Sequence, residues 1–352
     1  MQRGRPVLAL TLASALFAAA QACHPVPPET LRPAAQAPAW PPPPDRARVR
    51  YVTTVREPRD LGIRRGMIRR FLEWAVRGRT SRLMRRPFAV VTIADGGLAV
   101  ADPDAHAVHL FDTARNRYKR ITRAGREPLL SPVGLASDGN GRLYVSDSMA
   151  RRVSVFSDGG KWRGDLDLPP LGRPTGLAYD RTHRFLWIVD TAEHHLIRFE
   201  PATGEARIIG RRGTGPGEFN YPVSVAVDRA GTVYVGDSMN FRIQVLGPEG
   251  RFLGAFGEPG TVAGRFDKIK GVAVDSEGHI YVVDALHDVI QIFDRRGSLL
   301  TVVGGSGTGP GEFWLPAGIH IDDDRIFVAD SANHRLQILT FLGDRGTEND
   351  LG

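Results

Sequence analysis

The 352-residue sequence predicts an all-β fold that is built from copies of one small antiparallel sheet. Residues 219–246 contain three apolar runs, rich in Val, Ile and Tyr and separated by Gly, Asp, Asn or Pro, and a fourth run follows at 252–256. Short runs of this composition, bounded by turn-forming residues, are typical of β-strands joined by tight turns. A sheet of four such strands cannot bury both of its faces alone, so we expect neighbouring copies to cover it.

Copies of this unit recur along the chain with a steady period. An Asp ends the second strand of each copy, and successive Asp residues are 45, 43, 47, 47 and 46 positions apart. A period in the forties with four strands per unit predicts a β-propeller with six blades, each a four-stranded antiparallel sheet. The six residues are Asp102, Asp147, Asp190, Asp237, Asp284 and Asp330, and the first strands open at Pro87, Pro132, Pro174, Pro222, Ile269 and Pro316.

Three sequence words recur in register within these copies. They are PVGLASDGNGRLYVSDSMARRVSVF at 132–156, GVAVDSEGHIYVVDALHDVIQIF at 271–293 and PAGIHIDDDRIFVADSANHRLQIL at 316–339. These words resemble NHL repeats, which form six-bladed propellers, and the resemblance extends over residues 87–343. It implies the fold but not the function, because one fold carries many functions.

The start of the chain predicts export and lipid attachment. Residues 1–22 combine Arg3 and Arg5 with a short apolar stretch, as a secretory leader does. The leader ends Ala-Gln-Ala before Cys23, the only cysteine, and this resembles a bacterial lipoprotein cleavage site at which the Cys is lipidated. The alternative is an ordinary secretory leader with an incidental Cys. Because His24 replaces the Asp that resembles an inner-membrane retention signal, we expect anchoring at the outer membrane of the bacterial cell envelope.

Between the leader and the blades, the sequence predicts a tether and a closing strand. Residues 23–49 are rich in proline, which favours an extended linker. Residues 50–55, RYVTTV, form a strand with no neighbour in sequence, while the sixth blade has only three strands, near 317–321, 326–330 and 335–341. We therefore expect residues 50–55 to complete the last blade, which gives a propeller over 50–343 and a polar tail at 344–352.

A basic segment at 61–86 lies between the closing strand and the first blade. It contains nine Arg and one Glu, and its apolar positions predict an inserted amphipathic helix with Arg69, Arg70 and Arg77 on the polar side. These arginines are candidate binding residues for an acidic protein surface or for lipid headgroups. The net charge of +7 is thus local, because the segment and the leader together carry +10 and leave −3 elsewhere. Local charge and export both argue against a nucleic-acid partner.

Several other motifs in the repeats are better explained by structure. The blade Asp residues can accept turn N–H groups, and Arg152, Arg242 and Arg335, five positions later, can reach neighbouring carbonyl groups. The two GTGPGEF stretches at 213–219 and 307–313 lack the Lys and Ser or Thr of a phosphate loop, so we expect connections between blades. Residues 322–324, all Asp, predict a turn, with a cation site as the less favoured alternative.

One blade-opening position is a candidate ligand site. The resemblance to NHL propellers implies that the residues following the blade openers lie near the mouth of the central channel, and Lys270 alone among them is charged. Lys270 is therefore a candidate to bind a small anion, and the alternative is a solvated Lys paired with a nearby Asp. The six positions are Phe88, Val133, Thr175, Val223, Lys270 and Ala317.

Enzymes with this architecture provide a test of function. Amidating lyases are similar to NHL propellers and bind zinc through His at the positions just described, where this chain has no His. The carboxylate set of gluconolactonase-like propellers is also missing there, and His194 and His195 are adjacent on a strand, so their side chains diverge. We therefore expect no metal and no cofactor. The predicted function is a monomeric, envelope-anchored binding or scaffolding module for a protein, peptide or glycan. The alternative is a metal-dependent lactonase- or lyase-like enzyme with a non-standard site.

Overall fold

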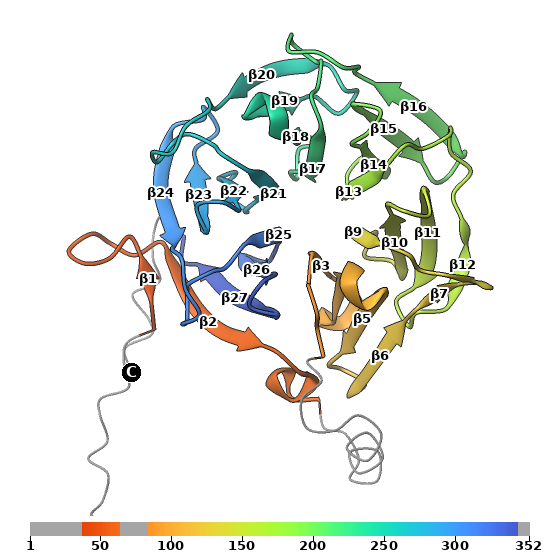
Figure 1. Cartoon of the computed structure of the whole chain (residues 1–352), viewed down its shortest axis with the longest axis horizontal. Helices are drawn as coiled ribbons and strands as arrows, with labels where there is room; N and C mark the ends of the chain where they lie inside the picture. Colours follow the sequence, from red (N-terminus) through yellow and green to blue (C-terminus); the bar gives the residue numbers. More distant parts are fainter. Residues whose placement is uncertain (1–36, 64–82, 344–352) are drawn as a thin grey trace, which may run out of the picture. The chain divides into compact units, whose positions relative to one another are not determined.

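The computed structural model describes residues 37–63 and 83–343. Within these ranges, six sheets surround a central axis, so the predicted six-bladed β-propeller is confirmed (Figure 1). The described part of the chain contains strands and short 3-10 turns but no α-helix, and none of its helices is long and apolar enough to span a membrane. The predicted leader, Cys23 and the polar tail lie outside the described residues.

Each blade is an antiparallel meander whose first strand lies nearest the axis (Figure 1). Blade 1 consists of β3 (Ala89–Thr92), β4 (Leu98–Asp102), β5 (Ala107–Asp112) and β6 (Arg117–Ile121). Blade 2 consists of β9 (Pro132–Ser137), β10 (Arg142–Asp147), β11 (Arg152–Ser157) and β12 (Trp162–Asp165). Blade 3 consists of β13 (Pro174–Asp180), β14 (Phe185–Asp190), β15 (His195–Glu200) and β16 (Glu205–Ile209). A small hairpin of β7 (Arg123–Ala124) and β8 (Glu127–Pro128) connects blades 1 and 2.

Blades 4 to 6 repeat this arrangement. Blade 4 consists of β17 (Pro222–Val227), β18 (Val233–Asp237), β19 (Arg242–Leu246) and β20 (Phe252–Phe256). Blade 5 consists of β21 (Ile269–Val274), β22 (Ile280–Asp284), β23 (Val289–Phe293) and β24 (Leu299–Gly304). Blade 6 contains β25 (Pro316–Asp322), β26 (Arg325–Asp330) and β27 (Arg335–Phe341). The 3-10 turns are η1 (Pro58–Leu61), η2 (Ala94–Gly96), η3 (Pro103–Ala105) and η4 (Ser238–Asn240).

The second strand of every blade is buried along its last five residues, because neighbouring blades cover both of its faces. All five residues of β4 and all five of β18 are buried. One apolar cluster joins Trp187 and Val189 of blade 3 to Val225 and Val235 of blade 4. A blade therefore obtains its core from its neighbours, as the repeat pattern predicted.

The first strands approach one another closely, and this limits the size of one side chain. The position two residues after each blade opener is Ala, Gly or Ser in all six blades. At Gly134 an added Cβ would lie 1.9 Å from the Thr175 carbonyl oxygen of the next blade, and at Gly318 it would lie 2.5 Å from the Phe88 carbonyl oxygen. Gly318 also donates its N–H to that oxygen at 2.8 Å, which joins blade 6 to blade 1.

The two ends of the propeller close the ring, as predicted. Strand β2 (Val49–Val55) pairs antiparallel with β27, with Val55 opposite Leu336 and Val49 opposite Phe341. This pairing supplies the fourth strand of blade 6 from the N-terminal side of the chain (Figure 1). It also gives hydrogen-bond partners to an edge that would otherwise be free to pair with other chains.

The described part of the expected tether is ordered, which the sequence did not predict. Residues 39 and 40 form β1 (Ala39–Trp40), a fifth strand that pairs with β2 through Trp40 and Val49. The Trp40 ring packs over Gly311, where an added Cβ would lie 2.4 Å from it, and borders the apolar cluster of blades 5 and 6. Burial of an indole ring explains why a proline-rich stretch adopts one conformation here.

The predicted amphipathic helix lies mostly outside the described residues, together with Arg69, Arg70 and Arg77. The described ends of the segment, 61–63 and 83–86, contain no α-helix. Ile63 and Met84 are buried in a cluster with Val55 and Val90, between blades 6 and 1. The segment is therefore attached at both ends to the place where the ring closes.

Ring closure can be tested with two truncated chains. A chain that begins at Arg48 loses only β1, whereas a chain that begins at Arg86 also loses β2 and with it Val49 and Val55, which are 1% and 0% exposed. Each buried Val contributes about 1.5–3 kcal/mol, and β27 becomes an open edge. We expect the Arg86 chain to melt at a much lower temperature than the Arg48 chain in circular dichroism. Equal melting temperatures would contradict a closing role for β2.

Candidate functional site

The topology gives the propeller two different faces. The loops between second and third strands and the connections between blades lie on one side, which we call the loop face. The hairpin turns between first and second strands, and between third and fourth strands, lie on the other side, which we call the turn face. The blade Asp residues end the second strands, so they lie just beneath the loop face.

The six blade Asp residues hold the connections of the loop face in place. All six are 0% exposed, and each accepts the backbone N–H of the residue two positions before its blade opener. Asp102, Asp147 and Asp190 also accept a backbone N–H of the following turn, as predicted, for example that of Ala150 at 3.1 Å, whereas the other three contact side-chain nitrogens of that turn. The pairs with the connections are Asp102 with Arg85 (2.6 Å), Asp147 with Leu130 (2.7 Å), Asp190 with Gly172 (2.7 Å), Asp237 with Asn220 (2.7 Å), Asp284 with Asp267 (3.0 Å) and Asp330 with Trp314 (2.8 Å).

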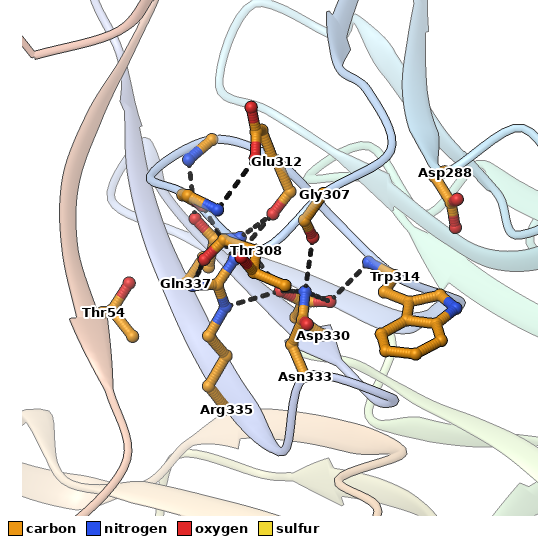
Figure 2. Close-up of polar contacts among 12 residues, drawn as sticks. Thr54, Asp288, Gly307, Thr308, Glu312, Trp314, Asp330, Asn333, Arg335 and Gln337 are labelled. Carbon is orange, nitrogen blue, oxygen red and sulfur yellow. Dashed lines mark hydrogen bonds and ion pairs between the residues drawn. The ribbon is translucent and has the colours of Figure 1, made fainter.

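In blade 6, Arg335 and Gln337 extend this network to the GTGPGEF connection (Figure 2). Arg335 Nε lies 2.6 Å from Asp330 Oδ2, and its terminal nitrogens donate to the carbonyl oxygens of Thr308, Gly309 and Glu312. Gln337 also donates to the Glu312 carbonyl oxygen. Blade 4 has the same arrangement with Arg242, Gln244 and Asp237. Both GTGPGEF stretches are therefore connections between blades, as predicted.

The backbone that this network holds presents apolar side chains outward. In blade 6, the Trp314 N–H donates a hydrogen bond to Asp330, and the Leu315 N–H donates one to Asp288 at 2.7 Å. The Trp314 indole points away from the network (Figure 2). In blade 4, the Tyr221 N–H donates to His194 Nδ1 at 3.1 Å, and the two rings are 4.4 Å apart between centroids. Trp314 is 54% exposed and Tyr221 43%. Each side chain is thus exposed on a backbone with a fixed position.

Exposed large apolar side chains are distributed unequally over the described residues. Eight lie on the loop face, six lie on the outermost strands, and none lies in the hairpin turns of the turn face. Large apolar side chains that are exposed on one face of a domain favour an interaction site on that face. The eight are Leu130, Met149, Tyr221, Met239, Val262, Leu286, Trp314 and Leu315, and the six are Val52, Trp162, Ile208, Leu253, Leu299 and Leu300.

An apolar ring divides the central channel into two compartments. Each blade contributes to the ring the residue three positions after its opener, and all six of these side chains line both compartments. The compartment on the loop face has a volume of about 60 Å³, and the one on the turn face has a volume of about 330 Å³. The ring residues are Val90, Leu135, Leu177, Val225, Val272 and Ile319.

Lys270 lines the loop-face compartment, at the mouth where the sequence placed it. Its Nζ atom lies 5.7 Å from the centre of the Phe88 ring, and within the described residues no carboxylate forms an ion pair with it. Burial, and then the positive charges of Lys268, Arg86 and Arg173, lower the pKa of Lys270 below its usual value. The predicted alternative was a solvated Lys270 paired with a nearby Asp, and no Asp among the described residues forms that ion pair.

The turn-face compartment is polar at its outer end. Asp323 and Asp324 have left-handed backbone angles, φ 46 and 59, so residues 322–324 form a turn, as predicted. Asp324 accepts the N–H and the hydroxyl of Ser276 in blade 5. His320 Nε2 lies 3.0 Å from Thr92 Oγ1 across the junction of blades 6 and 1, and burial lowers the pKa of His320 to about 4. No group of three or more His, Cys, Asp or Glu side chains suitable for a metal is found among residues 37–63 and 83–343.

The sequence reasoning missed the apolar residues of the loop face. Seven of the eight follow a simple rule, because they occupy one of the two positions before a blade opener or the second position after a blade Asp; Val262 lies elsewhere in the connection between blades 4 and 5. Met149, Met239 and Leu286 all follow the second part of this rule. The signal was present in the repeat alignment, but its meaning depends on knowing which face these positions share.

The role of Arg335 can be tested by changing its charge. Arg335 is 2% exposed and pairs with the fully buried Asp330, so Arg335→Met leaves a buried carboxylate without its partner. We expect a loss of about 3–5 kcal/mol in the free energy of unfolding, measured by urea denaturation. Arg325→Met is the matched control, because Arg325 is exposed and its guanidinium carbon stacks over the Phe327 ring, 5.3 Å from the ring centre. A similar effect of both variants would contradict this role.

Comparison with known proteins agrees with the repeat and the fold. Residues 219–246 match the NHL repeat, and residues 263–341 match a family described as a 6-bladed beta-propeller. The chain is 28% identical to NHL repeat-containing protein 3 of Mus musculus over 152 residues, which cover 42% of this chain and 43% of the mouse protein. The aligned part thus spans less than half the length of that relative.

Solved structures with the same fold include a binding protein and a lyase. An auxiliary nutrient binding protein from Bacteroides thetaiotaomicron is 12% identical with a TM-score of 0.57, over 73% of this chain and 69% of that chain. Virginiamycin B lyase from Staphylococcus aureus is 14% identical with a TM-score of 0.56, over 73% of this chain and 95% of that chain. At such low identity these similarities concern the fold only. This chain is therefore a six-bladed β-propeller that contains an NHL repeat.

Proposed function

We propose that this chain is a binding module of the bacterial cell envelope, anchored by lipid on Cys23, and that its partner docks on the loop face. The observation that supports this proposal is the gathering of eight exposed apolar side chains on that face. Apolar and aromatic side chains of this kind supply most of the affinity in protein interfaces. A protein or peptide is the favoured partner, and a glycan that stacks on Trp314 or Tyr221 is the alternative.

The rigidity of the loop face favours binding. Backbone N–H groups of Trp314, Leu315 and Tyr221 are each held by a side chain of a blade, so little backbone freedom is lost on docking. A surface that is already ordered binds more tightly than one that must order on binding. The hydrogen bonds that stabilise the propeller therefore also prepare its binding surface.

The basic segment is proposed to contribute charge to partner binding. It leaves the described chain at Ile63 and returns at Leu83, both in the connection between blades 6 and 1 on the loop face. Arg69, Arg70 and Arg77 would attract an acidic protein surface or anionic lipid headgroups. Partner binding that depends on these residues should weaken as the salt concentration rises.

A second candidate function is a metal-dependent lactonase- or lyase-like enzyme. The observation that favours it is the turn-face compartment, whose volume of about 330 Å³ is large enough for a small ligand and whose wall includes His320, Tyr179 and Asp228. A stoichiometric amount of zinc or calcium in the purified protein would favour this function over the binding module.

The docking face can be tested with two triple variants of the mature chain. Met149→Ser, Leu286→Ser and Trp314→Ser together remove apolar surface from the loop face, and Ile208→Ser, Leu253→Ser and Leu299→Ser remove a similar amount from the outermost strands. We expect the first variant to capture its envelope partner at least tenfold more weakly, because interface affinity depends on a few central apolar residues. Partner amounts are measured by quantitative mass spectrometry of immobilised protein. Equal capture by the two variants would refute docking on the loop face.

The anchor can be tested separately in a bacterial host. Labelled palmitate should be incorporated into the wild-type protein, which should sediment with membranes. Cys23→Ser should abolish the label and release the protein into the soluble fraction, since one modified Cys carries the acyl chains. Label that persists on the Cys23→Ser variant, or is missing from the wild type, would rule out this attachment.

A further inference from the structure

The loop-face compartment collects positive charge, and its own ammonium group, that of Lys270, forms no ion pair with a described carboxylate. Three cations occupy the last position before a blade opener, namely Arg86, Arg173 and Lys268, and Lys270 lies inside the compartment itself. Arg86 has an exposed partner, Asp104, at 3.6 Å, whereas no described carboxylate forms an ion pair with Lys270. The charges that act on Lys270 from these neighbours are all positive. A half-buried ammonium group in such a field is stabilised by an anion.

We propose that the loop-face compartment is a carboxylate site in which Lys270 binds the carboxylate of an apolar ligand. The ligand is either a short-chain carboxylic acid or the C-terminus of a peptide whose last residues are apolar. The inference rests on the proposed function, because the peptide form would dock on the same face. It adds the chemical group that the centre of that face recognises.

A carboxylate group matches the size and the charge of the compartment. The compartment volume of about 60 Å³ has room for a few water molecules, so a carboxylate group fits there. The compartment contains one ammonium group, which balances one negative charge. A phosphate monoester carries about two negative charges at neutral pH and requires more donors than Lys270 supplies.

The walls of the compartment favour an apolar group next to the carboxylate. Phe88, Val133 and Val223 line it beside Lys270, and the apolar ring closes its inner end. Around the mouth, Leu315 and Tyr221 directly precede the blade openers Pro316 and Pro222 and are 46% and 43% exposed. A carboxylate held by Lys270 would thus place the preceding apolar groups of the ligand on the apolar side chains of the loop face.

The experiment compares four proteins with defined probes. The probes are butyrate, acetyl-Ala-Leu with a free C-terminus, the same peptide with an amidated C-terminus, and inorganic phosphate. The proteins are the wild type, Lys270→Met, Lys270→Arg and the control Lys161→Met, which removes an exposed charge from a hairpin turn of the turn face. Binding is measured by calorimetry and ligand-observed NMR, and circular dichroism verifies that each variant is folded.

We expect butyrate or the free peptide to bind the wild type, and Lys270→Met to weaken this binding at least tenfold. Lys270→Arg should retain much of it, Lys161→Met should change it less than threefold, and amidation should cost the peptide as much as Lys270→Met does. Binding of butyrate alone identifies a small acid as the ligand, and binding of the peptide alone identifies a C-terminus. The proposal is overturned if neither probe binds the wild type at millimolar concentration, if Lys270→Met binds as the wild type does, or if phosphate binds more tightly than both.

These outcomes are separable from those of the proposed function. If Lys270→Met retains full capture of the envelope partner while the loop-face triple variant loses it, docking on the loop face stands and the carboxylate site fails. If butyrate binding depends on Lys270 while the triple variant still captures the partner, the carboxylate site stands and the docking face is elsewhere.

Discussion

One interaction, repeated six times, organises this propeller: a buried Asp at the end of each second strand accepts backbone N–H groups from the connection that enters the blade. A buried carboxylate is stable only when its oxygens are hydrogen-bonded, so each Asp forces the connection into one path. In four blades the Asp accepts two consecutive N–H groups of the connection. In blades 4 and 6, Arg242 and Arg335 occupy the second oxygen instead, and the second N–H bonds a residue of the preceding blade, His194 or Asp288.

The connections into blades 4 and 6 carry three of the eight exposed apolar side chains of the loop face, namely Tyr221, Trp314 and Leu315. In the proposed function, stability and recognition therefore use the same hydrogen bonds, and a change such as Arg335→Met would alter both the free energy of unfolding and the position of Trp314. The turn face has no comparable set of exposed apolar residues among those described.

The channel adds a second asymmetry between the faces. The apolar ring separates a small compartment with Lys270 from a larger one whose outer end carries Asp228, Asp275 and residues 322–324. Opposite charges at the two ends favour different ligands, an anion at the loop face and a neutral or cationic group at the turn face. The carboxylate site and the alternative enzymatic function thus occupy different ends of the channel and do not compete for the same residues.

The sequence by itself determined the blade count and the structural role of the blade Asp residues, because each depends on a local pattern repeated in register. The closing strand at 50–55 followed from the strand that the sixth blade lacks, and the position of Lys270 near the channel followed from the resemblance to NHL propellers. Only the tertiary structure decided the rest. Strand β1 has two residues and no periodic signal, and it forms because β2 offers an edge and Gly311 leaves space for Trp40. Met149, Leu286 and Trp314 are distant in sequence, and the positive charges around Lys270 come from three connections. Such groupings arise only when the ring closes and brings separate blades to one face.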